Sequence, residues 1–205
     1  MNVKIQRVVT SGVFALDGGE WDVDNNVWLV GNETEVLVID AAHDADAIAA
    51  AVGDRRVIAI ACTHGHNDHV NAAPRLADQL AGEVPIWLHQ DDRVLWDMTH
   101  TERQPDAPLT DGQTITVGNV DLSVLHTPGH APGAVCFYAP SLGAVFTGDT
   151  LFEGGPGATG RSYSDYDTIV ASIKSRLLPL PSETVVHTGH GPDTTIGAEA
   201  AGLND

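Results

Sequence analysis

The chain has 205 residues, of which 42% are hydrophobic and 19% charged, a composition typical of a folded protein rather than a disordered one. Its 28 acidic and 10 basic residues give a formal net charge of -18, which argues against duplex nucleic acid or an anionic membrane as a partner, because both bind basic surfaces. This length predicts a single domain, residues 1–205, and no apolar run reaches the roughly 20 residues of a membrane-spanning helix.

In the first half of the chain, β-branched apolar runs predict strands and three other stretches predict helices. The expected strands are 3–9, 27–31, 35–40, a buried strand at 57–63, and 85–90. The expected helices are 44–52, 71–82 and 91–98, with a loop over 99–113. Pro74 is tolerated only in the first turn of the second helix, and Gly82 is its expected stop.

The second half repeats the pattern. Strands are expected at 114–118, 120–127, 134–140 and 143–149, followed by a glycine-rich loop at 154–165. A helix at 166–178 is expected to begin after Ser164, with Asp167 completing a capping box, and 184–191 is a last strand and loop. Two runs of strands, each accompanied by helices, predict two sheets packed face to face with helices outside, an α/β sandwich of four layers.

The chain shows no signal-peptide pattern, so we expect a cytoplasmic protein. Cys62 and Cys136 both lie in apolar runs, which predicts buried free thiols rather than a disulfide framework. The sequence leaves the oligomeric state open.

Ten histidines are unusual for this length, and one cluster of them suggests a metal site. His64, His66, Asp68 and His69 follow directly after the buried strand at 57–63. Four potential ligands within six residues are costly to bury unless they bind something. The alternative is a polar loop whose histidines bond to the backbone, which suits a single histidine better than this cluster.

Three further candidate ligands, His130, Asp149 and His190, lie at the ends of later strands, each in a turn of small residues. Five histidines and two aspartates exceed what one four-coordinate zinc uses, whereas two metals that share a bridging aspartate use all seven. The remaining histidines receive ordinary roles: capping or solvent for His43, single polar residues for His89 and His100, and strand positions or an orienting contact for His126 and His187.

The order HxHxDH, TPGH, GD and GHG resembles the metallo-β-lactamase superfamily, and specifically its glyoxalase II-like thioesterase branch. The resemblance extends over nearly the whole chain and implies a four-layer αβ/βα sandwich with two face-to-face mixed sheets. It implies that His64, His66 and His130 hold one metal, that Asp68, His69 and His190 hold a second, and that Asp149 bridges them. Asp40 matches a family aspartate that supports the metal loop without ligating.

Some features depart from individual branches of that family. Neither cysteine stands at a ligand position, which disfavours the commonest zinc β-lactamases. The flavin domain of flavodiiron proteins and the long insertions of the nucleases are missing. The extra C-terminal helical region by which larger glyoxalase II enzymes bind glutathione is also missing, so we expect only a weak hold on a glutathione carrier. The 154–165 segment loosely resembles small bacterial hydrolases suspected of acting on mycothiol thioesters.

These observations predict a metal-dependent hydrolase that cleaves small-molecule acyl thioesters by a metal-bridging hydroxide, with Asp68 and Asp149 as its catalytic carboxylates. Five imidazoles suit zinc, although iron or manganese would also fit this donor set. Arg161, the only cation of the expected access loop at 153–164, is the predicted anchor for a substrate carboxylate, unless it is simply a solvated loop residue. The alternatives are a mononuclear iron persulfide dioxygenase, a lactonase and a non-catalytic metal-binding scaffold.

Overall fold

The first sheet takes its strands from the first half of the chain. The computed structural model describes residues 2–203, and in it six strands pair in the order β1-β2-β3-β4-β5-β6. Their bounds are β1 (Lys4–Leu16), β2 (Gly19–Gly31), β3 (Glu35–Ile39), β4 (Arg56–Ala61), β5 (Ile86–His89) and β6 (Ala107–Leu109). The pairs from β1 to β3 are antiparallel and those from β3 to β6 are parallel.

Each parallel step of this sheet is connected through helices. These are α1 (Ala45–Val52), α2 (Asn67–Val70), α3 (Ala73–Gln79), the 3-10 turn η1 (Gln90–Asp92) and α4 (Arg93–Thr99). The side chain of Asp44 caps α1 by accepting a hydrogen bond from the Ala47 N–H, and Pro74 lies in the first turn of α3, where its missing N–H costs no helical bond. This helix ends three residues before Gly82, not at it.

The second sheet has the order β14-β13-β10-β9-β8-β7. Its strands are β7 (Thr114–Val117), β8 (Val120–His126), β9 (Val135–Ala139), β10 (Ala144–Gly148), β13 (Val185–Thr188) and β14 (Thr194–Thr195). Only β10 and β13 pair in parallel, and the connection between them contains a small ribbon, β11 (Leu151–Phe152) with β12 (Gly155–Pro156), and then α5 (Tyr166–Ser172). A π-helical turn, η3 (Ile173–Leu177), continues α5, and α6 (Ile196–Leu203) follows β14. The 3-10 turn η2 (Pro140–Leu142) joins β9 to β10.

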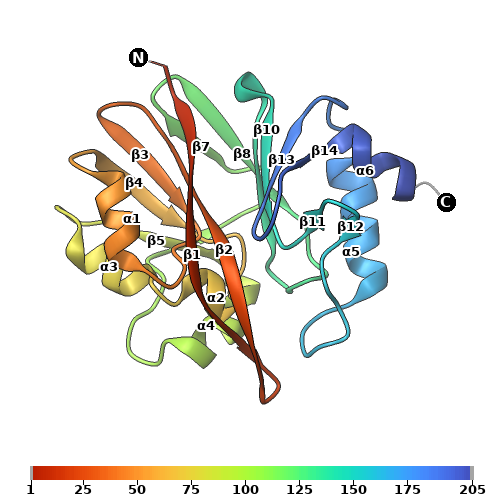
Figure 1. Cartoon of the computed structure of the whole chain (residues 1–205), viewed down its shortest axis with the longest axis horizontal. Helices are drawn as coiled ribbons and strands as arrows, with labels where there is room; N and C mark the ends of the chain where they lie inside the picture. Colours follow the sequence, from red (N-terminus) through yellow and green to blue (C-terminus); the bar gives the residue numbers. More distant parts are fainter. Residues whose placement is uncertain (1, 204–205) are drawn as a thin grey trace.

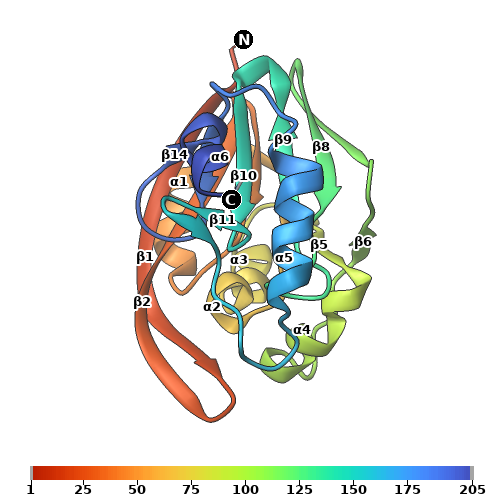
Figure 2. The same ribbon diagram turned by 90° about the vertical axis from the view of Figure 1, so that its right-hand side faces the viewer.

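Three apolar interfaces hold the layers together. The middle one lies between the two sheets and includes Trp28, Leu37, Phe137 and Phe146, all buried. A second cluster packs α1 and α3 on the outer face of the first sheet, and a third packs α5 and α6 on the second sheet. Figure 1 shows the two sheets facing each other between these outer helices, and Figure 2 looks onto α5 and α6. This confirms the predicted four-layer sandwich of mixed sheets.

The structure departs from the prediction most at the first hairpin, where β1 and β2 have 13 residues each and extend well beyond the predicted strands. Much of the added length is exposed, so its residues lack a continuous apolar pattern. The turn is an Asp17-Gly18 pair with positive φ at both residues, and an Asp-Gly pair of this kind favours a two-residue hairpin turn.

Two smaller corrections concern the helix after the glycine-rich loop and the chain's last elements. Asp165, not Ser164, caps α5, because its carboxylate accepts the Thr168 N–H at 2.7 Å. Ser164 instead closes a turn on the Arg161 carbonyl at 2.7 Å. The expected loop at 99–113 contains the short edge strand β6, and β14 and α6 follow the strand that was expected to be last. Within residues 2–203, no helix is long and apolar enough to cross a bilayer.

Candidate metal centre

The seven predicted ligands all follow the carboxyl ends of strands, and the fold brings these ends together between the two sheets. The segment with His64, His66, Asp68 and His69 leaves β4 of the first sheet. The other three leave strands of the second sheet: His130 follows β8, Asp149 follows β10, and His190 follows β13. The centre is therefore assembled from both halves of the chain.

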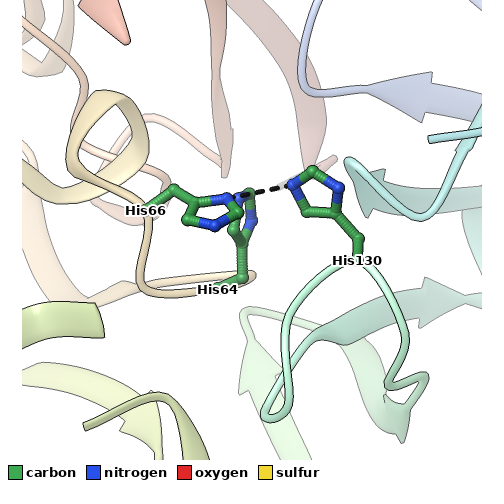
Figure 3. Close-up of side chains that lie close together, drawn as sticks. All are labelled: His64, His66 and His130. Atoms are coloured by element: carbon green, nitrogen blue, oxygen red, sulfur yellow. Dashed lines mark hydrogen bonds between the residues drawn. The ribbon is translucent and has the colours of Figure 1, made fainter. Parts of the chain in front are cut away.

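His64, His66 and His130 form the first group of ring nitrogens, and all three side chains are buried. Figure 3 shows the rings turned toward one another across the space between their two loops. His66 Nδ1 and His130 Nε2 lie 3.0 Å apart, and the three ring centroids are 4.8–4.9 Å from one another.

Hydrogen bonds outside the group fix which nitrogen of two of these rings carries the proton. Thr63 Oγ1 donates its only proton to an Asp40 carboxylate oxygen at 2.7 Å, so it accepts from His64 Nδ1 at 3.1 Å. His130 Nδ1 donates to the Ala158 carbonyl at 2.8 Å. In both rings Nε2 then keeps its lone pair and is free to bind a metal.

Asp68, His69 and His190 form the second group. His190 Nε2 lies 3.3 Å from Asp68 Oδ2 and 3.2 Å from His69 Nε2. The opposite ring nitrogens again donate outward, from His69 Nδ1 to Asp40 at 2.9 Å and from His190 Nδ1 to the Asp24 carbonyl at 2.8 Å. The Nε2 atoms of both rings thus face the centre.

Asp149 lies between the two groups. Its Oδ1 is 3.3 Å from His69 Nε2, while its Oδ2 is 3.4 Å from His190 Nε2 and 3.6 Å from His130 Nε2. One carboxylate therefore contacts nitrogens of both groups, which is the position that a bridging ligand requires.

Burial keeps the first group neutral. It lowers the pKa of His64 well below its ordinary value, and burial, with a smaller contribution from the neighbouring His130 ring, lowers the pKa of His66 to about 3. Burial also lowers the pKa of His130, against the attraction of Asp149. Imidazoles bind metals in the neutral form, so these three rings need release no proton to do so.

The carboxylates reverse this balance in the second group. Burial alone would lower the pKa of His190, but the charge and hydrogen bond of Asp149 outweigh it and raise that pKa to about 10. Burial would also lower the pKa of His69. The charges of Asp149 and Asp68 outweigh that effect, so the pKa of His69 rises well above its ordinary value. In the absence of a metal, the rings of His69 and His190 therefore carry an extra proton. A divalent ion that binds here displaces these protons, so the metal affinity of the second group rises with pH.

The residues present fit a pair of divalent metal ions. Among the described residues, His64 Nε2, Asp68 Oδ1 and Asp149 Oδ1 are buried without a hydrogen-bond partner, an arrangement that costs free energy unless a ligand satisfies them. Imidazole nitrogens mixed with carboxylate oxygens suit zinc, iron or manganese.

Another cluster, His89, Asp91 and His126, has a different geometry. The two rings stack at 4.3 Å with planes only 11° apart, so they lie one over the other, unlike the edge-to-face rings of the first group. His126 Nε2 donates to the Pro132 carbonyl, a backbone contact rather than one to a ligand side chain. His187 is paired with Asp193 at 3.0 Å.

Asp40 supports the centre without entering it. Its carboxylate accepts the Thr63 N–H and hydroxyl, each at 2.7 Å, and the His69 Nδ1–H at 2.9 Å. The residue has a positive φ of 58°, in the left-handed region that residues other than glycine adopt infrequently. One carboxylate thereby orients ligands of both groups.

A second support was missed from the sequence. Asn25 Nδ2 donates to Asp68 Oδ2 at 3.1 Å, and its Oδ1 accepts from His43 Nε2 at 2.9 Å. Asn71 Nδ2 donates to His43 Nδ1 at 3.0 Å, which completes a chain of hydrogen bonds ending on Asp68. The assignment of His43 to capping or solvent is therefore wrong. The sequence offers one indication, the pair of asparagines Asn25 and Asn26 directly before the apolar run of β2.

Arg161 lies at the tip of the first hairpin, outside the ligand groups. Its guanidinium carbon is 3.8 Å from the centroid of the Trp21 ring, and Phe14 beside it contacts the His66 ring edge-on at 5.3 Å. The Ser162 N–H donates to Asp17 at 2.9 Å, which fastens this loop to the hairpin turn. Arg161 is thus connected to the first ligand group through Phe14, whose ring lies 5.7 Å from the guanidinium carbon.

Comparisons with known proteins point to one family. The hydroxyacylglutathione hydrolase GloC of Haemophilus influenzae is 33% identical over 183 residues, covering 82% of this chain and 85% of its own. The crystal structure of the B3 metallo-beta-lactamase BLEG-1 matches with a TM-score of 0.78 at 32% identity, over 94% of this chain and 97% of that one. The protein TTHA1623, solved in a di-iron-bound form, matches with a TM-score of 0.77 at 37% identity, over 87% and 93%. The sequence profile of the metallo-beta-lactamase superfamily matches residues 21–190, a span that includes all seven converging side chains, and the chain therefore belongs to that superfamily.

Proposed function

We propose that this protein is a dinuclear metal-dependent hydrolase that cleaves acyl thioesters of a low-molecular-weight thiol. The observation that carries the proposal is the convergence of seven nitrogen and oxygen donors in two groups that share Asp149. The relationship to a hydroxyacylglutathione hydrolase at 33% identity supports the thioester as substrate.

Two bound divalent ions would supply an attacking water of pKa about 7 and an electrophile for the carbonyl oxygen. One ion would be held by His64, His66 and His130. The other would be held by Asp68, His69 and His190, and Asp149 would contact both ions. Asn25 and Asp40 fix the orientation of Asp68 and His69 through outward hydrogen bonds. Asp68, proposed here as a ligand, is also the carboxylate that we expect to accept a proton from the attacking water. A thiol of pKa about 8.5 leaves as its thiolate, so no strong general acid is needed.

The test is a substrate panel assayed on protein of measured metal content. We expect close to two metal atoms per chain and measurable hydrolysis of thioesters carried on glutathione, mycothiol or coenzyme A, with one small carrier preferred. A persistent content of one iron together with oxygen consumption on a persulfide would instead indicate a dioxygenase. Two bound metals with no thioester hydrolysed by any carrier would contradict the proposal.

The relationship to BLEG-1, at 32% identity, makes a β-lactam the second substrate class to include. Cleavage of a lactam expels an amine, a much poorer leaving group than a thiolate, and requires proton donation to nitrogen. We therefore expect β-lactam hydrolysis to be slower than thioester hydrolysis, and the reverse order would favour the lactamase assignment.

Arg161 is proposed to bind a substrate carboxylate. Stacking on Trp21 leaves the edge of the guanidinium available for a planar, two-bonded contact. Loss of a charge-assisted hydrogen bond of roughly 1.5–3 kcal/mol predicts that Arg161→Ala lowers kcat/KM by about 10- to 150-fold on an anionic thioester. Arg161→Lys should recover only part of this, since an ammonium group cannot make the planar contact.

Steady-state kinetics give kcat/KM for both variants, and the metal content of each is checked on the same sample. Arg75→Ala is the matched control, because Arg75 is also exposed but pairs with Asp46 on the outer helices. Kinetics of Arg161→Ala equal to those of the unmodified protein would mean that Arg161 is a solvated loop residue.

A further inference from the structure

Asp92 is a fully buried carboxylate that contacts two ligand loops at once. It ends η1, directly after β5, and its exposed fraction is 0%. Its Oδ2 accepts the Gly65 N–H at 2.8 Å, and its Oδ1 accepts the Gly133 N–H at 2.5 Å. Each carboxylate oxygen therefore binds a different segment of the backbone.

The two segments are those that carry the first ligand group. Gly65 stands between His64 and His66, and Gly133 is three residues after His130 in the loop that returns the chain to β9. The first loop follows a strand of one sheet and the second follows a strand of the other. Asp92 thus joins the two sides of the sandwich where the three rings meet.

Both loops approach Asp92 so closely that only glycine fits. A Cβ added at Gly65 would lie 2.7 Å from the Asp92 carbonyl oxygen, and one added at Gly133 would lie 2.7 Å from the Asp92 nitrogen. These distances are shorter than van der Waals contact, so a larger residue at either position would push its loop away from Asp92. Close backbone packing and a hydrogen bond therefore fix both loops against Asp92.

Burying a carboxylate costs free energy, and two backbone N–H groups alone offset only part of it. Such a residue is therefore expected where both N–H groups must be held at a fixed distance. Among residues 2–203, no lysine, arginine or histidine forms an ion pair with Asp92. A carboxylate accepts at two separate oxygens, whereas an asparagine of the same size has one acceptor and turns an NH2 group toward the other donor. The chemistry of this position therefore matches the joint fixing of two loops.

We propose that Asp92 is a positioning residue that sets the distance between the His64–His66 loop and the His130 loop, and so holds the first metal group selectively. The second group, Asp68, His69 and His190, has further supports in Asn25 and Asp40, of which Asp40 also reaches His64 through Thr63. The inference rests on the two-metal centre of the proposed function, but it concerns metal binding and not the identity of the substrate.

The experiment measures Co²⁺ affinity at each group separately. In a His190→Ala background only the first group is complete, and in a His130→Ala background only the second. Adding Asp92→Asn to the first background should weaken Co²⁺ binding by about 10- to 100-fold, the usual effect of removing a partner that orients metal ligands, and should alter the visible Co²⁺ spectrum. Adding it to the second background should change neither.

Two controls separate positioning from general loss of stability. Asp91→Asn changes the exposed neighbour and should leave both affinities unchanged. Leu177→Ala removes a buried side chain from the core under α5 and should lower the melting temperature without a selective effect on the first group. If Asp92→Asn does not fold, Gly133→Ala displaces the same loop while keeping the carboxylate and should give the same selective loss.

Equal weakening of both groups, or unchanged affinity at the first, would overturn the role of Asp92. Because these titrations use no substrate, they are independent of the proposed reaction. A protein that binds two ions but hydrolyses no thioester would contradict the proposed function and leave the result for Asp92 intact.

Discussion

Replacing Asp149 with alanine is expected to weaken both metal sites together and to abolish hydrolysis. Asp149 is the one predicted ligand whose two oxygens contact nitrogens of both groups, His69 and His190 on one side and His130 on the other. Its loss also leaves the protonated His69 and His190 without their main counter-charge. Because a metal ion contributes several kcal/mol to the stabilisation of developing charge, the fall in kcat should reach about 1,000-fold or more.

Elemental analysis and thioester kinetics on the same sample measure this. Asp97→Ala provides the control, since Asp97 is a half-exposed carboxylate paired with Arg93 on α4 and lies outside the ligand groups. Two tightly bound ions in Asp149→Ala would show that the carboxylate does not bridge. Loss of only one ion would assign it to a single site.

Removing the metals with a chelator is expected to abolish activity and to destabilise the fold. The buried atoms His64 Nε2, Asp68 Oδ1 and Asp149 Oδ1 then lose their partners. An ion present at about 100 times its dissociation constant stabilises the folded state by about 2.7 kcal/mol, so two ions contribute about 5 kcal/mol. For a chain of this size that corresponds to a fall in Tm of about 10–20 °C.

Calorimetry before and after dialysis against a chelator gives the shift, and adding back zinc, iron or manganese one at a time identifies the metal that restores activity. The same chelator treatment applied to Asp149→Ala is the control, and it should change Tm far less. An unchanged Tm and rate in protein verified to be metal-free would contradict a metal centre.

The fold class could be predicted from the sequence, and the seven candidate ligands could be proposed from it, because both depend on local patterns. Strand runs recur at regular spacing, and His64, His66, Asp68 and His69 form one contiguous segment. The residues that support the ligands are harder to find, since Asp92 has the same residue type as the half-exposed Asp91 directly before it. Only the fold shows which of the two aspartates is buried against both loops.

The same reason explains the other omissions. Asn25 and His43 are distant from Asp68 in the sequence, and their shared role depends on the pairing of β2 against the metal loop. The edge strand β6 has only three residues, too few for a recognisable strand pattern. It is a strand because it pairs with β5. Long-range contacts of this kind leave no periodic trace in one sequence.

Because the centre draws on both halves of the chain, it is completed late during synthesis on the ribosome. The loop with His64 to His69 emerges early and can settle on the first sheet, whereas His190 follows β13, near the end of the described chain. A nascent chain that lacks β13 holds the first histidines and both aspartates but not the full donor set. The full set of candidate ligands is therefore present only after β13 and the turn that follows it have been synthesised.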